Sequence, residues 1–143
     1  MAVMALLVAG CASGSDVVTP ERLDGTWVWV AATVDGEPFA LDPSLSTEAR
    51  PDVPGWLRFR PGGILEGEGP CNHLRGRYRL DGDRIVFDAT VTLVGCMPEQ
   101  MMEAEAVLVD DLLFAPEVTA TMRGDHELVL ADEDTELVFR RIP

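Results

Sequence analysis

The chain has 143 residues, which is the length of a single domain. Hydrophobic residues make up 47% of it and charged residues 25%, so the sequence is too apolar for a disordered protein. Its 25 acidic residues outnumber the 11 basic ones and give a net charge of −14, which argues against a nucleic-acid partner, because such affinity rests on neutralising phosphates.

The first residues resemble the end of a bacterial lipoprotein signal. Residues 2–9 are apolar but too few to span a membrane, and they lead into Val8-Ala9-Gly10-Cys11. This ending resembles the lipobox, in which small residues precede a cysteine that takes the lipid. No Lys or Arg precedes Arg22, so the basic start of a signal is missing. We interpret residues 1–10 as a truncated lipoprotein signal peptide, the alternative being an apolar N-terminus with a stray cysteine.

Small polar residues follow Cys11 and predict a flexible tether over residues 11–22. Lipidation at Cys11 would place the protein on the extracytoplasmic side of a bacterial membrane. Its expected partners are then the membrane, through the lipid anchor, and an unidentified envelope protein.

The folded body begins with a nearly all-apolar strand over residues 26–34. Trp27 and Trp29 point to one face of this strand, and apolar residues on its other face indicate that both faces are covered. Asp35-Gly36 predicts a hairpin turn, and residues 41–55, rich in Pro, Ser and Asp, predict an irregular loop.

Apolar and polar residues alternate over residues 56–88 and predict an antiparallel meander with a polar outer face. Arginines occupy outward positions on two of its strands, and Glu66 and Glu68 lie on the strand between them. Two interpretations stay open: a basic patch for an anionic ligand or partner, or cross-strand pairs with the two glutamates. The arginines are Arg58, Arg60, Arg75, Arg77 and Arg79.

A helix is predicted over residues 98–114, because this stretch lacks internal Pro and Gly and Pro98 suits a first helical turn. Its apolar residues recur at helical spacing and include Met101, Ala104, Leu108 and Leu112. Three short strands follow, over residues 118–122, 127–131 and 136–140. The whole pattern predicts an α+β fold: a mostly antiparallel, strongly curved, barrel-like sheet packed against one α-helix.

Four motifs occur in an order that resembles the META domain of HslJ-type heat-shock lipoproteins. They are a Gly-Thr-Trp strand, a Gly-x-Cys-Asn turn into a strand, a Thr-x-x-x-Cys segment, and a helix with Met, Glu and Leu. We assign residues 23–143 to one such META-like domain. The motif residues are Gly25, Trp27, Gly69, Cys71, Asn72, Gly76, Tyr78, Thr92, Cys96 and Glu105.

This resemblance implies a sheet that curls around a helix, in an envelope lipoprotein without an assigned catalytic activity. It also implies an association with stress response, drug tolerance or motility. No catalytic residues are carried over from the family.

Cys71 and Cys96 are the two cysteines of the body. Outside the cytoplasm a pair of cysteines tends to be oxidised, and a bridge here would tie the sheet to the helix. By the chain-entropy model it would contribute roughly 3.5 kcal/mol to stability. The alternative is two buried free thiols.

The sequence contains no persuasive catalytic or metal-binding constellation. Its serines lie in the tether and the loop, away from any nucleophile elbow, and Cys71-x-His73 is too closely spaced for a structural zinc pair. We therefore predict no enzymatic activity, no metal and no cofactor. Two functions remain: a non-catalytic envelope protein that acts through protein–protein contacts, or a small-ligand-binding module that uses the interior or mouth of the curved sheet.

Overall fold

A computed structural model describes residues 17–41, 47, 50, 53–94, 96 and 99–143. The predicted signal, the lipidation site Cys11 and most of the 41–55 loop lie outside the described residues. Within the described ranges, none of the helices has the length and apolar character needed to cross a membrane.

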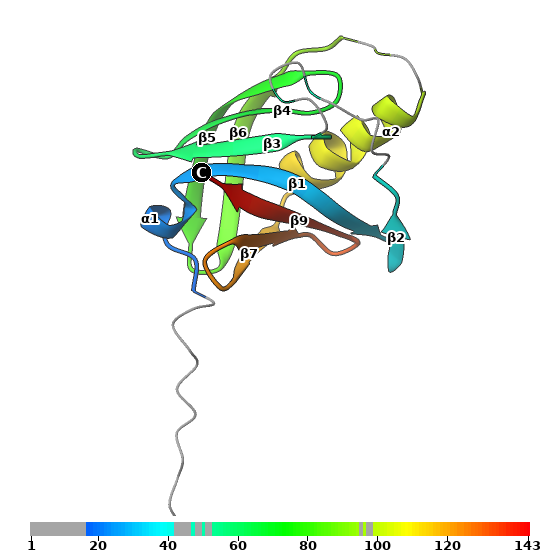
Figure 1. Cartoon of the computed structure of the whole chain (residues 1–143). Helices are drawn as coiled ribbons and strands as arrows, with labels where there is room; N and C mark the ends of the chain where they lie inside the picture. Colours follow the sequence, from blue (N-terminus) through cyan, green and yellow to red (C-terminus); the bar gives the residue numbers. More distant parts are fainter. Residues whose placement is uncertain (1–16, 42–46, 48–49, 51–52, 95, 97–98) are drawn as a thin grey trace, which may run out of the picture.

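Nine strands form one antiparallel sheet, in the order β2-β1-β3-β4-β5-β6-β7-β8-β9. Because β1 also pairs with β9, eight of them close into a barrel and β2 is an extra strand at its edge (Figure 1). The strands are β1 (Gly25–Val34), β2 (Glu37–Phe39), β3 (Trp56–Arg60), β4 (Ile64–Glu68), β5 (His73–Asp81), β6 (Arg84–Val91), β7 (Val118–Arg123), β8 (Glu127–Ala131) and β9 (Thr135–Ile142).

The predicted helix is present as α2 (Glu99–Leu108), which continues into the π-helical turn η2 (Val109–Leu113). A strongly curved antiparallel sheet packed against one helix is therefore confirmed, and the curvature goes as far as a closed barrel. Figure 1 shows α2 and the short helix α1 (Pro20–Leu23) on opposite sides of this barrel.

Buried side chains of the barrel and the helix form one core. The two tryptophans predicted to face inward, Trp27 and Trp29, are both fully buried. From the helix, Ala104, Leu108 and Leu112 are buried against them, as their spacing predicts. The helix methionines were expected inside as well, but Met102 is 49% exposed.

The stretch expected as tether over 11–22 is partly folded. The Thr19 side chain accepts a hydrogen bond from the Arg22 backbone N–H and caps α1, and Pro20 occupies its first turn. Leu23 at its end is fully buried in the core. Burial of Leu23 fixes α1 to the barrel, so residues 20–22 belong to the folded body.

The barrel closes differently on its two sides. β1 and β9 pair at eight positions, from Thr26↔Ile142 to Val34↔Thr135. Within the described ranges, β6 and β7 pair only at Arg84↔Thr119 and Ile85↔Val118, so most of β6 has no described partner strand on that side. Residues of α2 and η2 lie opposite the end of β6 on this side.

Candidate functional site

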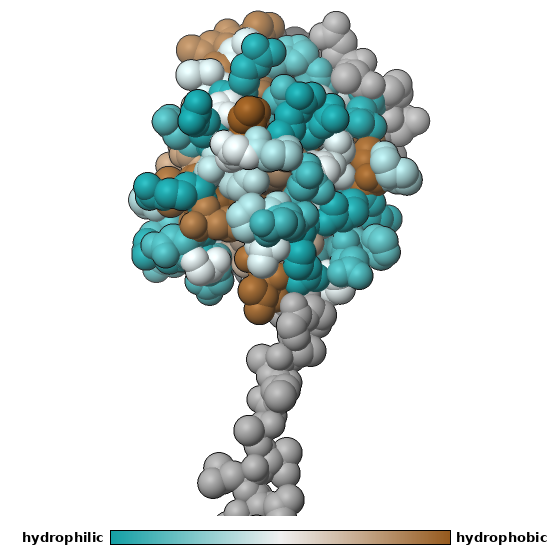
Figure 2. Space-filling view, turned by 90° about the vertical axis from the view of Figure 1, so that its left-hand side faces the viewer, coloured by the Kyte–Doolittle hydropathy of each residue, from teal (hydrophilic) through white to brown (hydrophobic). Residues whose placement is uncertain are grey.

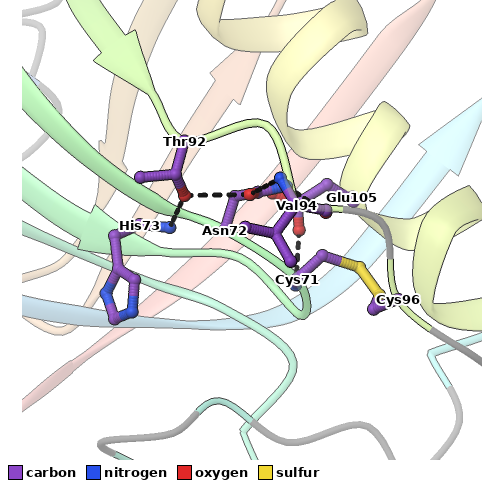
Figure 3. Close-up of a disulfide and its surroundings, with 7 residues drawn as sticks. All are labelled: Cys71, Asn72, His73, Thr92, Val94, Cys96 and Glu105. Atoms are coloured by element: carbon purple, nitrogen blue, oxygen red, sulfur yellow. Dashed lines mark hydrogen bonds between the residues drawn. A yellow bond between two sulfur atoms is a disulfide. The ribbon is translucent and has the colours of Figure 1, made fainter.

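Several residues of the family motifs come together just beyond the C-terminal end of β6. Asn72 is 7% exposed, and its Oδ1 accepts hydrogen bonds from Thr92 Oγ1 at 2.8 Å and from Val94 N–H at 2.7 Å. Its Nδ2 donates to the Val94 carbonyl at 3.1 Å. Thr92 Oγ1 in turn accepts from the His73 backbone N–H at 3.0 Å (Figure 3). One amide side chain therefore holds residues 92–94 where the strand pairing ends.

The predicted disulfide joins Cys71 to Cys96, with 5.6 Å between their Cα atoms. Cys71 precedes β5 and Cys96 follows the segment held by Asn72, so the covalent bond and the hydrogen bonds fasten the same two pieces of chain (Figure 3). Disulfides persist in oxidising compartments, which favours an extracytoplasmic location.

Glu105 connects this region to the helix. Its side chain is buried, and its Oε2 accepts a hydrogen bond from the Cys71 backbone N–H at 2.7 Å. Burial raises the pKa of the Glu105 carboxyl, although the hydrogen bond from Cys71 acts in the opposite direction. A Cβ on Gly69 would lie 2.6 Å from Glu105 Oε2, so this carboxyl requires a glycine beside it.

We name the group of Cys71, Asn72, Thr92, Cys96 and Glu105 the clamp. Its polar atoms make bonds that hold the β4–β5 turn, the segment after β6 and α2 together. In the described part of the chain, these motif residues therefore hold three segments together, and this structural role explains their spacing.

The other motif residues lie elsewhere in the barrel. A Cβ on Gly76 would lie 2.1 Å from the Asp88 carbonyl oxygen, so β5 and β6 approach too closely there for a side chain. Tyr78 packs edge-on against Phe59, with ring centroids 5.0 Å apart. Trp27 donates its Nε1–H to the Leu23 carbonyl at 2.8 Å and so ties β1 to α1. Gly25 starts β1.

The five predicted surface arginines are all exposed on the outer faces of β3 and β5, with β4 between them. Glu66 on β4 is paired across the sheet with Arg58 on one side and Arg75 on the other, and its Oε2 lies 3.3 Å from Arg60 Nε. Both interpretations of these arginines therefore keep some support. A role of Arg58, Arg60, Arg75, Arg77 and Arg79 in binding an anionic partner stays a prediction.

Glu68 was expected to face outward beside Glu66, but it is only 4% exposed. Its carboxylate lies 2.9 Å from His73 Nδ1 and accepts a hydrogen bond from Trp56 Nε1 at 3.0 Å. These two side chains, one from β5 and one from β3, cover the Glu68 carboxylate.

A groove of about 600 Å³ runs beside the clamp, between the end of β6 and the helix. Large apolar side chains around it reach solvent: Leu93 is 97% exposed, and Val94, Met102 and Phe114 are each about half exposed or more. The lining residues are Cys71, Asn72, Ala89, Thr90, Val91, Thr92, Leu93, Val94, Met102, Glu105, Ala106, Val109, Asp110 and Phe114.

The space-filling view shows the face of the molecule on the α1 side. Figure 2 shows apolar residues gathered at the top of the molecule, at the height where the segment after β6 lies in Figure 1. The face below, on the α1 side, is mostly hydrophilic with scattered apolar residues.

The groove was not predicted from the sequence. Its only local signal is the pair Leu93-Val94, two large apolar residues that follow a strand and belong to no element.

The groove offers apolar surface and hydrogen-bonding groups. Among the described residues, no group of three or more His, Cys, Asp or Glu side chains is arranged to hold a metal ion. Cys71 and His73, which could be drawn as nucleophile and base, have other partners, the disulfide and Glu68.

Comparison with known proteins gave two findings. The sequence matches the META domain family over residues 21–142. An NMR structure of a protein from Burkholderia xenovorans is similar in fold, with a TM-score of 0.63, 23% sequence identity and 86% of each chain covered. No curated protein matches the chain.

Proposed function

The chain belongs to the META domain family. We propose that it is a non-catalytic, lipid-anchored protein of the cell envelope that acts by contacting another protein. Protection of the envelope under stress is the cellular role that we attach to this contact, because the HslJ-type lipoproteins that it resembles are associated with stress response.

The exposed apolar groove is the observation that carries this proposal. Isolated apolar residues are common on protein surfaces, whereas several large ones around one hollow are typical of interaction sites. Leu93, Val94, Met102 and Phe114 all contribute exposed surface there. The adjoining clamp holds Val94 in place through Asn72, so the surface is presented in a defined shape.

The location rests on two separate supports. The Cys71–Cys96 disulfide favours an oxidising compartment, and the lipobox-like sequence before Cys11 supplies an anchor. The described chain enters the barrel through α1, on the side opposite α2 (Figure 1). A tether that reaches α1 would therefore leave the groove directed away from its attachment point.

The anchor is tested by the intact mass of the protein extracted from membranes. We expect a chain that starts at Cys11 and carries a lipid-sized mass, and we expect Cys11→Ala to leave the membrane fraction. A protein that keeps Met1 and has no lipid mass would contradict the anchor, as would a Cys11→Ala variant that stays with the membrane.

The protein contact is tested by placing a photo-crosslinking amino acid in the groove of the full chain in cells. Position Met102 lies on the groove wall, and position Thr121 is an exposed control on β7. We expect the Met102 probe to form a discrete adduct with one envelope protein and the Thr121 probe to form none. No adduct from Met102, or the same adducts from both positions, would refute the protein contact.

A small apolar ligand in the same groove is the second candidate, because about 600 Å³ lies within the range of ligand sites. The interior of the barrel is a weaker location for a ligand, since Trp27, Trp29 and Phe59 fill it with fully buried side chains. A thermal-shift screen with envelope metabolites and antibiotics tests this candidate. Stabilisation that disappears in a Met102→Glu variant would favour it over the protein contact.

A further inference from the structure

We propose that the groove binds an extended segment of the partner protein, which joins the sheet as a new strand along the free edge of β6. The segment would alternate apolar with other residues and carry at least one basic side chain. This inference rests on the proposed function, because it specifies the chemistry of the protein contact made by the same groove.

The first support is the incomplete pairing of β6. Its last ladder position with β7 is Ile85↔Val118, yet β6 continues to Val91. Over residues 86–91, no backbone hydrogen bond to that edge exists within the described part of the chain. An edge of this kind is a template for another strand, because each unpaired N–H and C=O can bond to an added backbone.

The second support is the direction of the backbone groups. In an antiparallel sheet, alternate residues direct their N–H and C=O groups to opposite edges. Thr92 N–H bonds the His73 carbonyl at 3.0 Å on the β5 side, and the Asp83 carbonyl accepts from Ala120 N–H at 2.7 Å on the β7 side. Even-numbered residues of β6 therefore bond to β5, and odd-numbered residues face the other edge.

It follows that Ala89 and Val91 direct their backbone N–H and C=O groups to the edge where β7 is missing. Both residues also line the groove. The free hydrogen-bonding groups and the apolar hollow therefore coincide, which is what addition of a strand requires.

The third support is the opposite wall of the groove. Met102, Ala106 and Val109 from α2 and η2 face the β6 edge across the hollow. A strand added to β6 would place every second side chain toward this apolar wall, as in other grooves formed between a strand edge and a helix. Alternation of apolar residues in the bound segment follows from this geometry.

The charge of the site favours a basic segment. Asp110 is exposed on the groove, and the chain as a whole carries −14. Exposed arginines lie on β3 and β5 and also on β6 (Arg84), β7 (Arg123) and β9 (Arg140), but the described residues that line the groove include no arginine. A lysine or arginine in the bound segment would complement Asp110 and be steered to the site by the acidic surface.

The experiment uses the full chain with Cys11→Ala and a phage-displayed library of random twelve-residue peptides. We expect the selected peptides to alternate apolar residues and to contain Lys or Arg. N-methylation of alternate amides in a selected peptide should weaken binding at least tenfold in one register and little in the other, since only one set of amides bonds to β6. On binding, hydrogen exchange of the Ala89 and Val91 amides should slow, whereas that of Asp88 and Thr90, already bonded to β5, should stay unchanged.

Two variants and a control locate the site. Met102→Glu and Asp110→Arg should each weaken the peptide at least tenfold, while Thr121→Glu on the distant outer face of β7 should leave binding unchanged. Insensitivity to N-methylation in both registers, or slowed exchange on a strand other than β6, would overturn the inference. Protection of Ala89 and Val91 that grows with protein concentration in the absence of peptide would also overturn it, because a second copy of the chain would then occupy the edge.

Failure of this inference can be told apart from failure of the proposed function. If the Met102 crosslinker captures an envelope protein in cells but no extended peptide binds, the protein contact stands and the added strand is wrong. If neither is observed, both are wrong.

Discussion

The two seams of the barrel close the same sheet in different ways. At the β1–β9 seam, eight register positions join the strands, interrupted by one irregularity between Trp29 and Ala31. At the β6–β7 seam, two register positions join the strands. Beyond them, a helix, the disulfide and the hydrogen bonds of Asn72 hold the chain together in place of strand pairing. The first seam is closed by backbone and the second largely by side chains.

The difference between the two seams indicates which part of a small barrel is available to bind a partner. A continuous backbone ladder leaves no free hydrogen-bonding groups for a partner. A seam closed by side chains leaves part of a strand edge and a hollow beside it, and the clamp keeps both in place. The long seam supplies stability, and the short seam supplies the surface on which the proposed contact depends.

The largest effect is expected from breaking the long seam. Leu137 on β9 is fully buried opposite Ala32 of β1. Leu137→Ala should lower the free energy of unfolding by about 2–5 kcal/mol, because it leaves a cavity in the core. Hydrogen exchange should accelerate in all strands together, since this seam is part of the global unit of unfolding. Acceleration confined to β9 would show that the long seam is not the global one.

A smaller and more local effect is expected from cutting the disulfide at the short seam. Cys71→Ser combined with Cys96→Ser should lower the free energy of unfolding, measured with urea, by about 2–4 kcal/mol. Exchange should accelerate first in residues 92–94 and α2, while β1 and β9 stay protected. Equal acceleration at both seams would contradict the division between them.

The contact between Gly69 and Glu105 tests how tightly the short seam is packed. Gly69→Ala places a Cβ 2.6 Å from Glu105 Oε2 and should cost about 1–3 kcal/mol by overpacking. Glu105→Ala removes that carboxylate together with the acceptor of the Cys71 N–H. In the Glu105→Ala background, Gly69→Ala should cost less than it does alone. Additive costs in urea denaturation would show that the two residues do not act on each other.

The sequence was most informative where the signal is local. Alternation over residues 56–88 predicted β3 to β6, because each strand buries only one face and short turns separate the strands. The helix was predicted for a similar reason, and the spacing of Ala104, Leu108 and Leu112 identified its buried face.

What the sequence did not show depends on contacts between distant segments. Closure of the barrel joins Thr26 to Ile142, and nothing in either strand specifies that pairing. The groove exists because β6 and β7 separate after Ile85, which is decided by where the helix packs. Burial of Glu68 likewise depends on Trp56 and His73, which its own alternation pattern does not include.

The cysteine pair and the family motifs were predicted in part: the residues could be identified from the sequence, but not all of their contacts. The motifs predicted which residues matter, and the pairing of Cys71 with Cys96 was predicted from compartment and number. Why Gly69 accompanies Glu105 became visible only once the helix was placed beside the β4–β5 turn.

The smallest effect is expected from pH, and it again separates the two seams, since Glu105 lies at the short one. Burial raises the pKa of its carboxyl above the ordinary value of 4.5, with Asp110 adding to the shift. The folded protein therefore holds this proton more tightly than the unfolded chain, so the stability contributed by protonated Glu105 is present below the ordinary pKa and is lost as pH rises through the folded pKa. Glu105→Gln cannot ionise, and its urea midpoint should fall less than that of the wild type across this range.

Asp111 is the matched control for this measurement. Its pKa is also raised, by burial first and then by Asp132, Asp110 and Asp35, so Asp111→Asn should remove a separate part of the same pH dependence. Amide exchange itself speeds up with pH, so exchange rates are compared after correction for this intrinsic effect. In Glu105→Gln, the corrected exchange of residues 92–94 should no longer accelerate as pH rises. In Asp111→Asn, the corrected exchange of residues 92–94 should still accelerate. Parallel stability curves for wild type and Glu105→Gln would mean that the carboxyl titrates alike in the folded and unfolded chain, and the clamp would then hold an ionised Glu105 at no cost to the short seam.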